Sequence, residues 1–202
     1  MSWSEVMNAN NGGGEAVEFV KTPVGTTKMR LLNVEPKATW KHWIQSANGG
    51  KGMSIVCAGK DNCPICKANA EAEAQGLKKK YNVTRAFSMN ALIEINGEKK
   101  IQILEKSASF FASLFTLKEQ MGDLINYEIN VSRTGSGMND TKYTILPVFP
   151  PVALTQPEKE KYMGMLIDLD EYYKVLPEAD VLTLMSGGSL AKDEESPQFE
   201  VE

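Results

Sequence analysis

The chain has 202 residues, of which 42% are hydrophobic, and a formal net charge of -4 at pH 7. This length predicts one main core with a small appendage. The sequence has no apolar run of about 18 residues, and its N-terminus lacks a basic start. It therefore predicts neither a membrane span nor a secretory signal. We therefore expect a cytoplasmic protein, in which clustered cysteines more often bind metal or act in redox chemistry than form disulfides.

The charge is unevenly distributed along the chain. Residues 1–154 carry 18 Lys and Arg against 14 Asp and Glu, a balance of +4, whereas residues 155–202 carry 4 against 12, a balance of -8. This asymmetry indicates a weakly basic binding body with an acidic interaction tail. An acidic end that only aids solubility is the alternative.

Short strands dominate the predicted elements. The Gly-rich start of the chain reads as a flexible arm. Alternating or β-rich segments then predict strands at 26–34, 38–46, 53–57, 91–95, 98–104, 126–133 and 143–146. A Gly-rich turn, ANGGKG, separates the second and third of these. Asn96-Gly97 predicts a two-residue type I′ hairpin, because both positions favour positive φ.

Three helices are predicted between and after the strands. Residues 67–80 are rich in Ala, Glu and Lys, which favours a short, mostly solvated helix. Residues 107–121 carry an apolar stripe that predicts core packing. A third helix begins at Thr155, where Thr-Gln-Pro-Glu fits a capping box, and Pro177 ends it.

This pattern predicts a mainly β (α+β) fold, with an OB-fold barrel as the expected architecture. An SH3-like barrel and an irregular α+β sheet would give similar periodicity. The expected organisation has five parts along the chain: a flexible arm at 1–15, an OB-fold core at 16–154, a zinc subdomain inserted at about 40–80, a helical extension at 155–190 and an acidic tail at 191–202.

All three cysteines lie within ten residues, in CAGKDNCPIC. Cys63 and Cys66 form a C-x-x-C pair that can reach one ion from a tight turn, and Cys57 lies close enough to be a third ligand. A closed structural zinc site requires four ligands. His42 is the single histidine of the chain, and a hairpin would bring its strand beside the strand that ends at Cys57. The sequence therefore predicts one structural Zn²⁺ bound by three cysteines and one histidine.

A thiol-disulfide oxidoreductase using Cys63 and Cys66 is the rival interpretation of the CPIC motif. It leaves Cys57 without a role, and no βαβ pattern leads into the motif. A closed four-ligand site also leaves no open position for a catalytic water, so we expect no enzyme activity.

Aromatic and basic residues alternate on or beside the predicted strands, a combination that can stack bases and hold phosphates of a single strand. For each aromatic side chain taken alone, core packing is an equally good interpretation. The predicted DNA-binding residues are Trp40, Lys41, Trp43, Lys60, Tyr81, Arg85, Phe87, Lys99, Lys100, Tyr127, Arg133, Lys142 and Tyr143.

In this order, the motifs resemble the T-even phage single-stranded DNA-binding (helix-destabilising) protein family. The resemblance covers roughly residues 26–150, and its most specific element is the histidine strand followed by three cysteines that end in C-P-x-C. It implies an OB-fold with an inserted zinc subdomain and a basic aromatic cleft. It also implies that His42, Cys57, Cys63 and Cys66 bind the zinc ion.

The resemblance implies a function in coating and protecting single-stranded DNA during phage replication, recombination and repair, in the host bacterial cytoplasm. The acidic tail would recruit replication and recombination proteins through Asp193, Glu194, Glu195 and Phe199. Self-association on DNA is compatible with the resemblance, although the N-terminal arm lacks the Lys and Arg of strongly cooperative members. A zinc-containing RNA-binding or transcription-associated module is the remaining alternative.

Overall fold

The computed structural model describes residues 17–45, 52–137 and 140–188. They fall into two units. Of the described residues, unit 1 contains Thr39–Ala86 and residues 170–188, and unit 2 contains residues 17–38 and Phe87–Leu169. The predicted flexible arm, most of the Gly-rich turn before Met53 and the predicted acidic tail lie outside the described residues.

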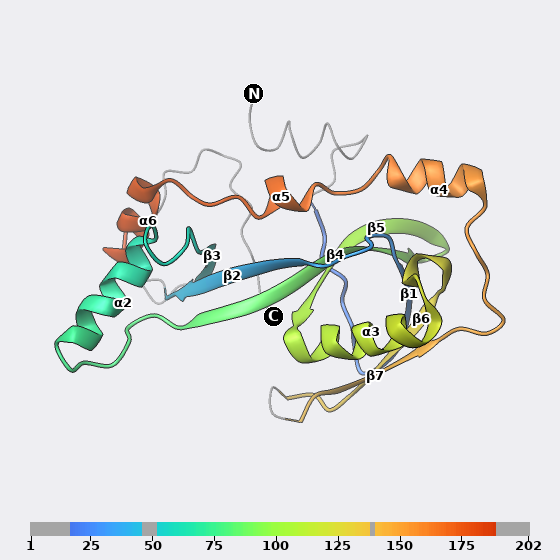
Figure 1. Cartoon of the computed structure of the whole chain (residues 1–202), viewed down its shortest axis with the longest axis horizontal. Coiled ribbons are helices and arrows are strands. Elements are labelled where there is room, and N and C mark those ends of the chain that lie inside the picture. The colour runs from blue at the N-terminus through green and yellow to red at the C-terminus, as the bar shows by residue number, and fades with distance from the viewer. Residues whose placement is uncertain (1–16, 46–51, 138–139, 189–202) are drawn as a thin grey trace. The chain divides into compact units, whose positions relative to one another are not determined.

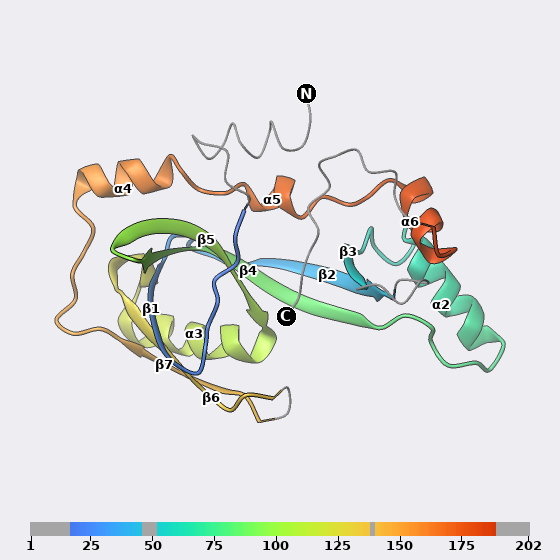
Figure 2. The same cartoon turned by 180° about the vertical axis from the view of Figure 1, so that it is seen from behind.

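Seven strands and five α-helices are found in the described part of the chain (Figures 1 and 2). The strands are β1 (Gly25–Leu31), β2 (Lys37–Ile44), β3 (Met53–Val56), β4 (Val83–Ile95), β5 (Glu98–Ser107), β6 (Ile129–Thr134) and β7 (Lys142–Pro147). The helices are α2 (Pro64–Ala74), α3 (Ala108–Met121), α4 (Gln156–Met163), α5 (Leu169–Tyr172) and α6 (Glu178–Met185), with a 3₁₀ turn at Leu124–Asn126. None of these helices combines the length and apolar character needed to cross a bilayer.

The strands form a mainly antiparallel, open sheet. Its order is β3-β2-β4-β1-β6-β7, and β5 pairs with β4 beside this path. The predicted mainly β class with a few helices is therefore confirmed, while the OB-fold barrel stays a prediction. Asn96 and Gly97 connect β4 to β5 with φ values of 53° and 82°. Positive φ at both positions is what a type I′ turn requires, as the Asn-Gly dipeptide predicts.

The core of unit 2 lies between helix α3 and the strands. Phe110, Leu114 and Leu117 are buried along one side of α3, as their helical spacing predicts. They pack with Met29 of β1 and Val131 of β6, among others. In Figure 2, α3 lies beside the β6–β7 hairpin, which it contacts through β7. Helix α3 also contacts β5.

Two helical predictions need correction. Helix α2 begins at Pro64 and ends at Ala74, so it starts inside the CPIC motif and stops before the lysines at 78–80. Proline is favourable at the start of a helix, because its missing N–H would have no partner there. The third predicted helix is not continuous: Thr155 forms the predicted capping box, but α4 ends at Met163. Pro177 does not end a helix; it is the N-cap of α6.

Candidate metal centre

Pairing of β2 with β3 brings the first two metal-ligand candidates together in unit 1. His42 lies opposite Ile55, and the backbone N–H of Cys57 donates to the carbonyl of Trp40 over 2.8 Å. Side chains two residues apart on a strand share a face. Cys57 therefore follows Ile55 on the face where His42 lies, although 15 positions separate the two ligands in the sequence.

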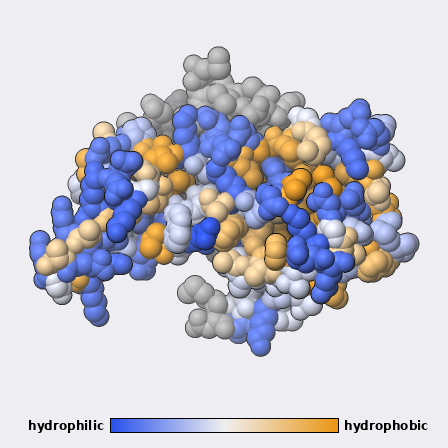
Figure 3. Space-filling view, viewed as in Figure 1, coloured by the Kyte–Doolittle hydropathy of each residue, from blue (hydrophilic) through white to orange (hydrophobic). Residues whose placement is uncertain are grey.

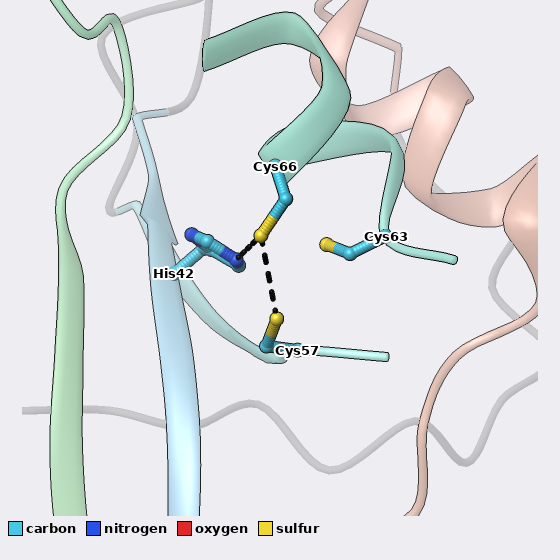
Figure 4. A group of neighbouring side chains, drawn as sticks. All are labelled: His42, Cys57, Cys63 and Cys66. Atoms are coloured by element: carbon cyan, nitrogen blue, oxygen red, sulfur yellow. Dashed lines mark hydrogen bonds between the residues drawn. The ribbon is translucent and has the colours of Figure 1, made fainter. Parts of the chain in front are cut away.

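A tight turn and the start of α2 supply the other two cysteines. Gly59 has a φ of 93°, and its carbonyl accepts hydrogen bonds from the N–H groups of Asn62 and Cys63. Cys63 is the N-cap of α2, and Cys66 lies in the first turn of the helix. The C-x-x-C spacing thus places one thiol before the helix and the next one within it, both directed toward the ends of β2 and β3 (Figure 4).

The distances between these side chains fit a shared metal ion. All four ligand atoms lie within 4.8 Å of one another. Sγ of Cys66 lies 3.4 Å from Nε2 of His42 and 3.6 Å from Sγ of Cys57 (Figure 4), and all three cysteines are free. A tetrahedral ion with metal–sulfur bonds of about 2.3 Å and metal–nitrogen bonds of about 2.0 Å holds its ligand atoms roughly 3.5 to 3.8 Å apart. A disulfide would require a sulfur–sulfur distance of about 2.05 Å.

The environment of His42 favours a neutral imidazole. Its side chain is buried, and burial lowers the pKa, although the backbone of Asn82 partly offsets this effect. Nδ1 has no hydrogen-bond partner of normal geometry among the described residues. A neutral ring that is protonated at Nδ1 has a lone pair at Nε2, the nitrogen that faces Cys66. The lowered pKa therefore favours the neutral imidazole that metal binding requires.

The three thiols differ in acidity because their surroundings differ. Burial, followed by the neighbouring Cys57 and Cys63 thiols, raises the pKa of Cys66 to about 12, and burial also raises the pKa of Cys57. Burial alone would raise the pKa of Cys63 as well, but hydrogen bonds from the backbone at Cys66, Ala58 and Ile65 outweigh it and lower that pKa. A bound cation would favour the thiolate form of all three side chains.

The candidate ligands are part of the core of unit 1. Cys63 packs in one apolar cluster with Ile65 of α2 and Val181 of α6, and helices α2 and α6 contact each other. The buried Asn69 links α2 to the segment at Tyr81: its amide donates to the carbonyl of Tyr81 over 2.8 Å and accepts from the Tyr81 N–H over 3.1 Å. At the left edge of Figure 3, where α2 lies, hydrophilic residues alternate with smaller apolar patches.

Six of the predicted DNA-binding residues lie in unit 1. Trp40 is 51% exposed and Trp43 is 40% exposed, and the guanidinium of Arg85 lies 5.5 Å from the centre of the Trp40 ring. Lys60 is also exposed. In contrast, Lys41 and Tyr81 are buried, and the Lys41 ammonium lies over the ring of Tyr173 at 4.5 Å.

The other seven lie in unit 2, where they do not form one group. Lys99 pairs with Glu158 and Lys100 with Glu98, while Phe87 packs against Phe111 and the Tyr127 hydroxyl donates to the carbonyl of Met121. Lys142 is exposed at the start of β7. Arg133 and Tyr143 do come together, directly opposite each other on β6 and β7.

Two residues that the sequence reasoning missed, Thr22 and Lys106, lie beside Tyr143. Neither residue lies in a predicted strand where aromatic and basic residues alternate, so the sequence did not indicate either of them. The predicted tail residues Asp193, Glu194, Glu195 and Phe199 lie outside the described part of the chain.

Comparison of the chain with protein-family models, with curated proteins and with solved structures found no match.

Proposed function

We propose that this chain is a non-catalytic single-stranded DNA-binding protein and that its Cys/His cluster holds one structural zinc ion. Three thiolates and one imidazole are a common ligand set of closed zinc sites. Four protein ligands fill a tetrahedral coordination sphere, so no position stays open for a reacting water. In this proposal the metal stabilises unit 1, and other side chains bind the nucleic acid.

One observation carries the DNA-binding proposal: the exposed ring of Trp40 lies against a cation. Trp40 is 51% exposed on β2, and Arg85 of β4 lies 5.5 Å from its ring centre. An exposed indole presents a surface on which a base can stack, and the adjacent guanidinium can contact the phosphate of the same nucleotide. Stacking on one aromatic side chain contributes about 1 to 3 kcal/mol and does not depend on base identity.

The fold and the charge distribution give further support. The sheet-rich body carries the excess of Lys and Arg, and an acid-rich C-terminal quarter follows it. This distribution suits a strand-coating protein with a partner-binding tail. We include an OB-fold barrel and tail-mediated recruitment of replication and recombination proteins in the proposal.

Fluorescence titration tests this function. Intrinsic Trp fluorescence is followed while poly-dT, duplex DNA and RNA are each added at two salt concentrations. Preferential quenching by poly-dT, weakened at the higher salt, is the expected result, because neutralised phosphates release counterions. An absence of binding to every single strand would overturn the proposal.

A pair of variants tests the role of Trp40. Trp40→Ala should weaken binding of a labelled dT oligonucleotide roughly tenfold, measured by anisotropy. Leu77→Ala is the control, since Leu77 is a large, 60% exposed hydrophobic residue of the same unit. If both variants bind the oligonucleotide with equal affinity, Trp40 is not part of the binding site.

A dithiol redox function is the second candidate, favoured by the lowered pKa of Cys63 at the start of α2. The metal content of the purified protein separates the two functions. One tightly bound zinc ion per chain occupies Cys63 and Cys66 and leaves no free dithiol. A metal-free protein that exchanges disulfides would support the redox function.

A further inference from the structure

Two cationic side chains of unit 2, those of Lys106 and Arg133, lie near Tyr143. Backbone pairing brings them together. Phe19 forms a parallel bridge with Ile103 of β5. Three residues further along each of these two segments, Thr22 lies beside Lys106. On the neighbouring hairpin, Arg133 of β6 is the direct antiparallel partner of Tyr143. Four side chains from distant parts of the sequence thus meet at the edge of the unit 2 core.

Hydrogen bonds hold this cluster in a fixed arrangement. Nζ of Lys106 donates to the Thr22 hydroxyl over 2.8 Å, and it lies 3.5 Å from the Tyr143 hydroxyl. The Thr22 and Tyr143 hydroxyls are 3.4 Å apart. Arg133 donates through Nη1 to the carbonyl of Thr22 over 3.1 Å. Phe110 packs edge-on against the Tyr143 ring, which fixes the direction of its hydroxyl.

The positive charge of the cluster has no acidic partner within the described residues. Lys28 and Lys99, elsewhere in unit 2, form ion pairs with Glu128 and Glu158. Lys106 and Arg133 instead contact hydroxyl and carbonyl groups. The Nε atom of Arg133 is buried without a hydrogen-bond partner. Two partly buried cations that share one site repel each other, and an anion placed between them would offset this cost.

The pKa of Tyr143 reports the same positive environment. Burial by itself would raise this pKa, but the Thr22 hydroxyl and the charges of Lys106 and Arg133 outweigh burial and lower it. The Thr22 hydroxyl and the two cations therefore stabilise negative charge at the phenol oxygen relative to an isolated tyrosine. A ligand anion beside that oxygen would experience the same attraction.

We propose that Lys106, Arg133, Tyr143 and Thr22 form a binding site for one phosphate group. An ammonium, a guanidinium and two hydroxyl groups offer several donors to the oxygens of a tetrahedral anion. The identity of the ligand rests on the proposed function: if the protein binds single-stranded DNA, the phosphate group is a phosphodiester of the DNA backbone. Lys106, Arg133 and Tyr143 are each partly exposed, so a backbone phosphate can reach them from solvent.

The salt dependence of binding tests the site in the full-length protein. Affinity for a labelled dT oligonucleotide is measured over a series of salt concentrations for the wild type, Lys106→Gln and Lys21→Gln. Lys106→Gln should weaken binding roughly tenfold and reduce the slope of log affinity against log salt by about 0.7, the loss of one phosphate contact. Lys21 is exposed beside Thr22 and takes no part in the cluster, so Lys21→Gln is the matched control. Equal losses in the two variants would overturn the site.

A second measurement separates this site from the DNA-binding function. Inorganic phosphate should raise the thermal midpoint of the wild type more than that of an Arg133→Gln, Lys106→Gln double variant, compared with chloride at equal ionic strength. If the wild type binds no oligonucleotide yet shows this difference, the proposed function fails and the phosphate site stands, with free phosphate as its source. If phosphate shifts both proteins equally, the site is refuted, because general salt effects act on both alike.

Discussion

Nε2 of His42 lies 3.4 Å from Sγ of Cys66, although 24 positions separate the two residues in the sequence. A strand supplies the imidazole and a helix supplies the thiol, so the centre forms only when α2 packs onto the β2–β3 pair. Because Cys63 also belongs to the apolar cluster of unit 1, binding of a metal ion at this cluster would be coupled to folding of the unit.

Substitution of one ligand should abolish tight metal binding. Cys57→Ser or His42→Gln should reduce the zinc content from one ion per chain to well below one, because three remaining ligands cannot close a tetrahedral site. Structural zinc contributes about 10 to 16 kcal/mol in small zinc-binding peptides, so unit 1 should also unfold at a lower temperature. Elemental analysis and circular dichroism measure the two effects. Asn62→Ala is the control, because Asn62 is exposed in the same loop. Full zinc content in His42→Gln would contradict the assignment.

Metal affinity should fall steeply as the pH is lowered. The raised pKa values of Cys57 and Cys66 mean that both thiols are protonated in the metal-free protein at neutral pH. Binding must displace these protons, so log affinity should fall by roughly two to three for each pH unit below 8. His42 adds little to this slope near neutral pH, because its pKa is lowered and the ring is already neutral. Competition with a chromogenic chelator measures the effect, and an affinity independent of pH would exclude thiolate ligands.

The candidate metal centre could be predicted from the sequence because the spacing of its Cys and His residues is informative. Three cysteines leave a tetrahedral site one ligand short, and His42 is the one histidine of the chain. A hairpin between its strand and the strand before Cys57 is the shortest connection. The cluster of Lys106 and Thr22 could not be predicted in this way. It depends on a parallel bridge between Phe19 and Ile103, and a long-range pairing of this kind leaves no local pattern.

Helix boundaries were less predictable for a related reason. The sequence predicts the C-x-x-C pair in a tight turn and a helix that begins at residue 67. In the structure α2 already begins at Pro64, and Cys63 is both its N-cap and a candidate metal ligand. The gap between α4 and α5 follows from tertiary contacts. Around Ile167 the backbone forms hydrogen bonds with the side chain of Asn90 instead of continuing a helix. Local propensity is overridden where a buried polar group supplies other partners.

Asn90 should be essential for holding the segment after α4 against unit 2. Its fully buried amide donates to the carbonyl of Ile167 over 3.0 Å and accepts from the Ile167 N–H over 2.9 Å. Asn90→Ala leaves both backbone groups unsatisfied, which should lower the free energy of unfolding by about 2 to 3 kcal/mol. Denaturant titration measures this loss, and hydrogen exchange should increase around Ile167. Gln120→Ala, at an exposed position of α3, serves as the control.

The capping box of α4 should make this helix sensitive to acid. The carboxylate of Glu158 accepts hydrogen bonds from the Thr155 N–H and hydroxyl, each over 2.9 Å. The backbone hydrogen bond, followed by the hydroxyl, lowers the pKa of Glu158. A lowered pKa in the folded state means that the contribution is fully present above the ordinary glutamate pKa of about 4.3 and is lost as the pH falls through the lower folded value.

Thr155→Ala tests this cap at neutral pH. The variant should lower stability by about 1 kcal/mol, the usual effect of losing an N-cap side chain. Because the Thr155 hydroxyl donates to the ionised carboxylate of Glu158, the difference between wild type and variant should become smaller as the pH falls below about 4. Urea titrations at several pH values give both results. Thr116→Ala is a suitable control, since Thr116 is exposed within α3 and donates only to the carbonyl of Ala112. A stability difference that stays constant into acid would show that the hydrogen bond from the Thr155 hydroxyl to the Glu158 carboxylate does not contribute to the cap.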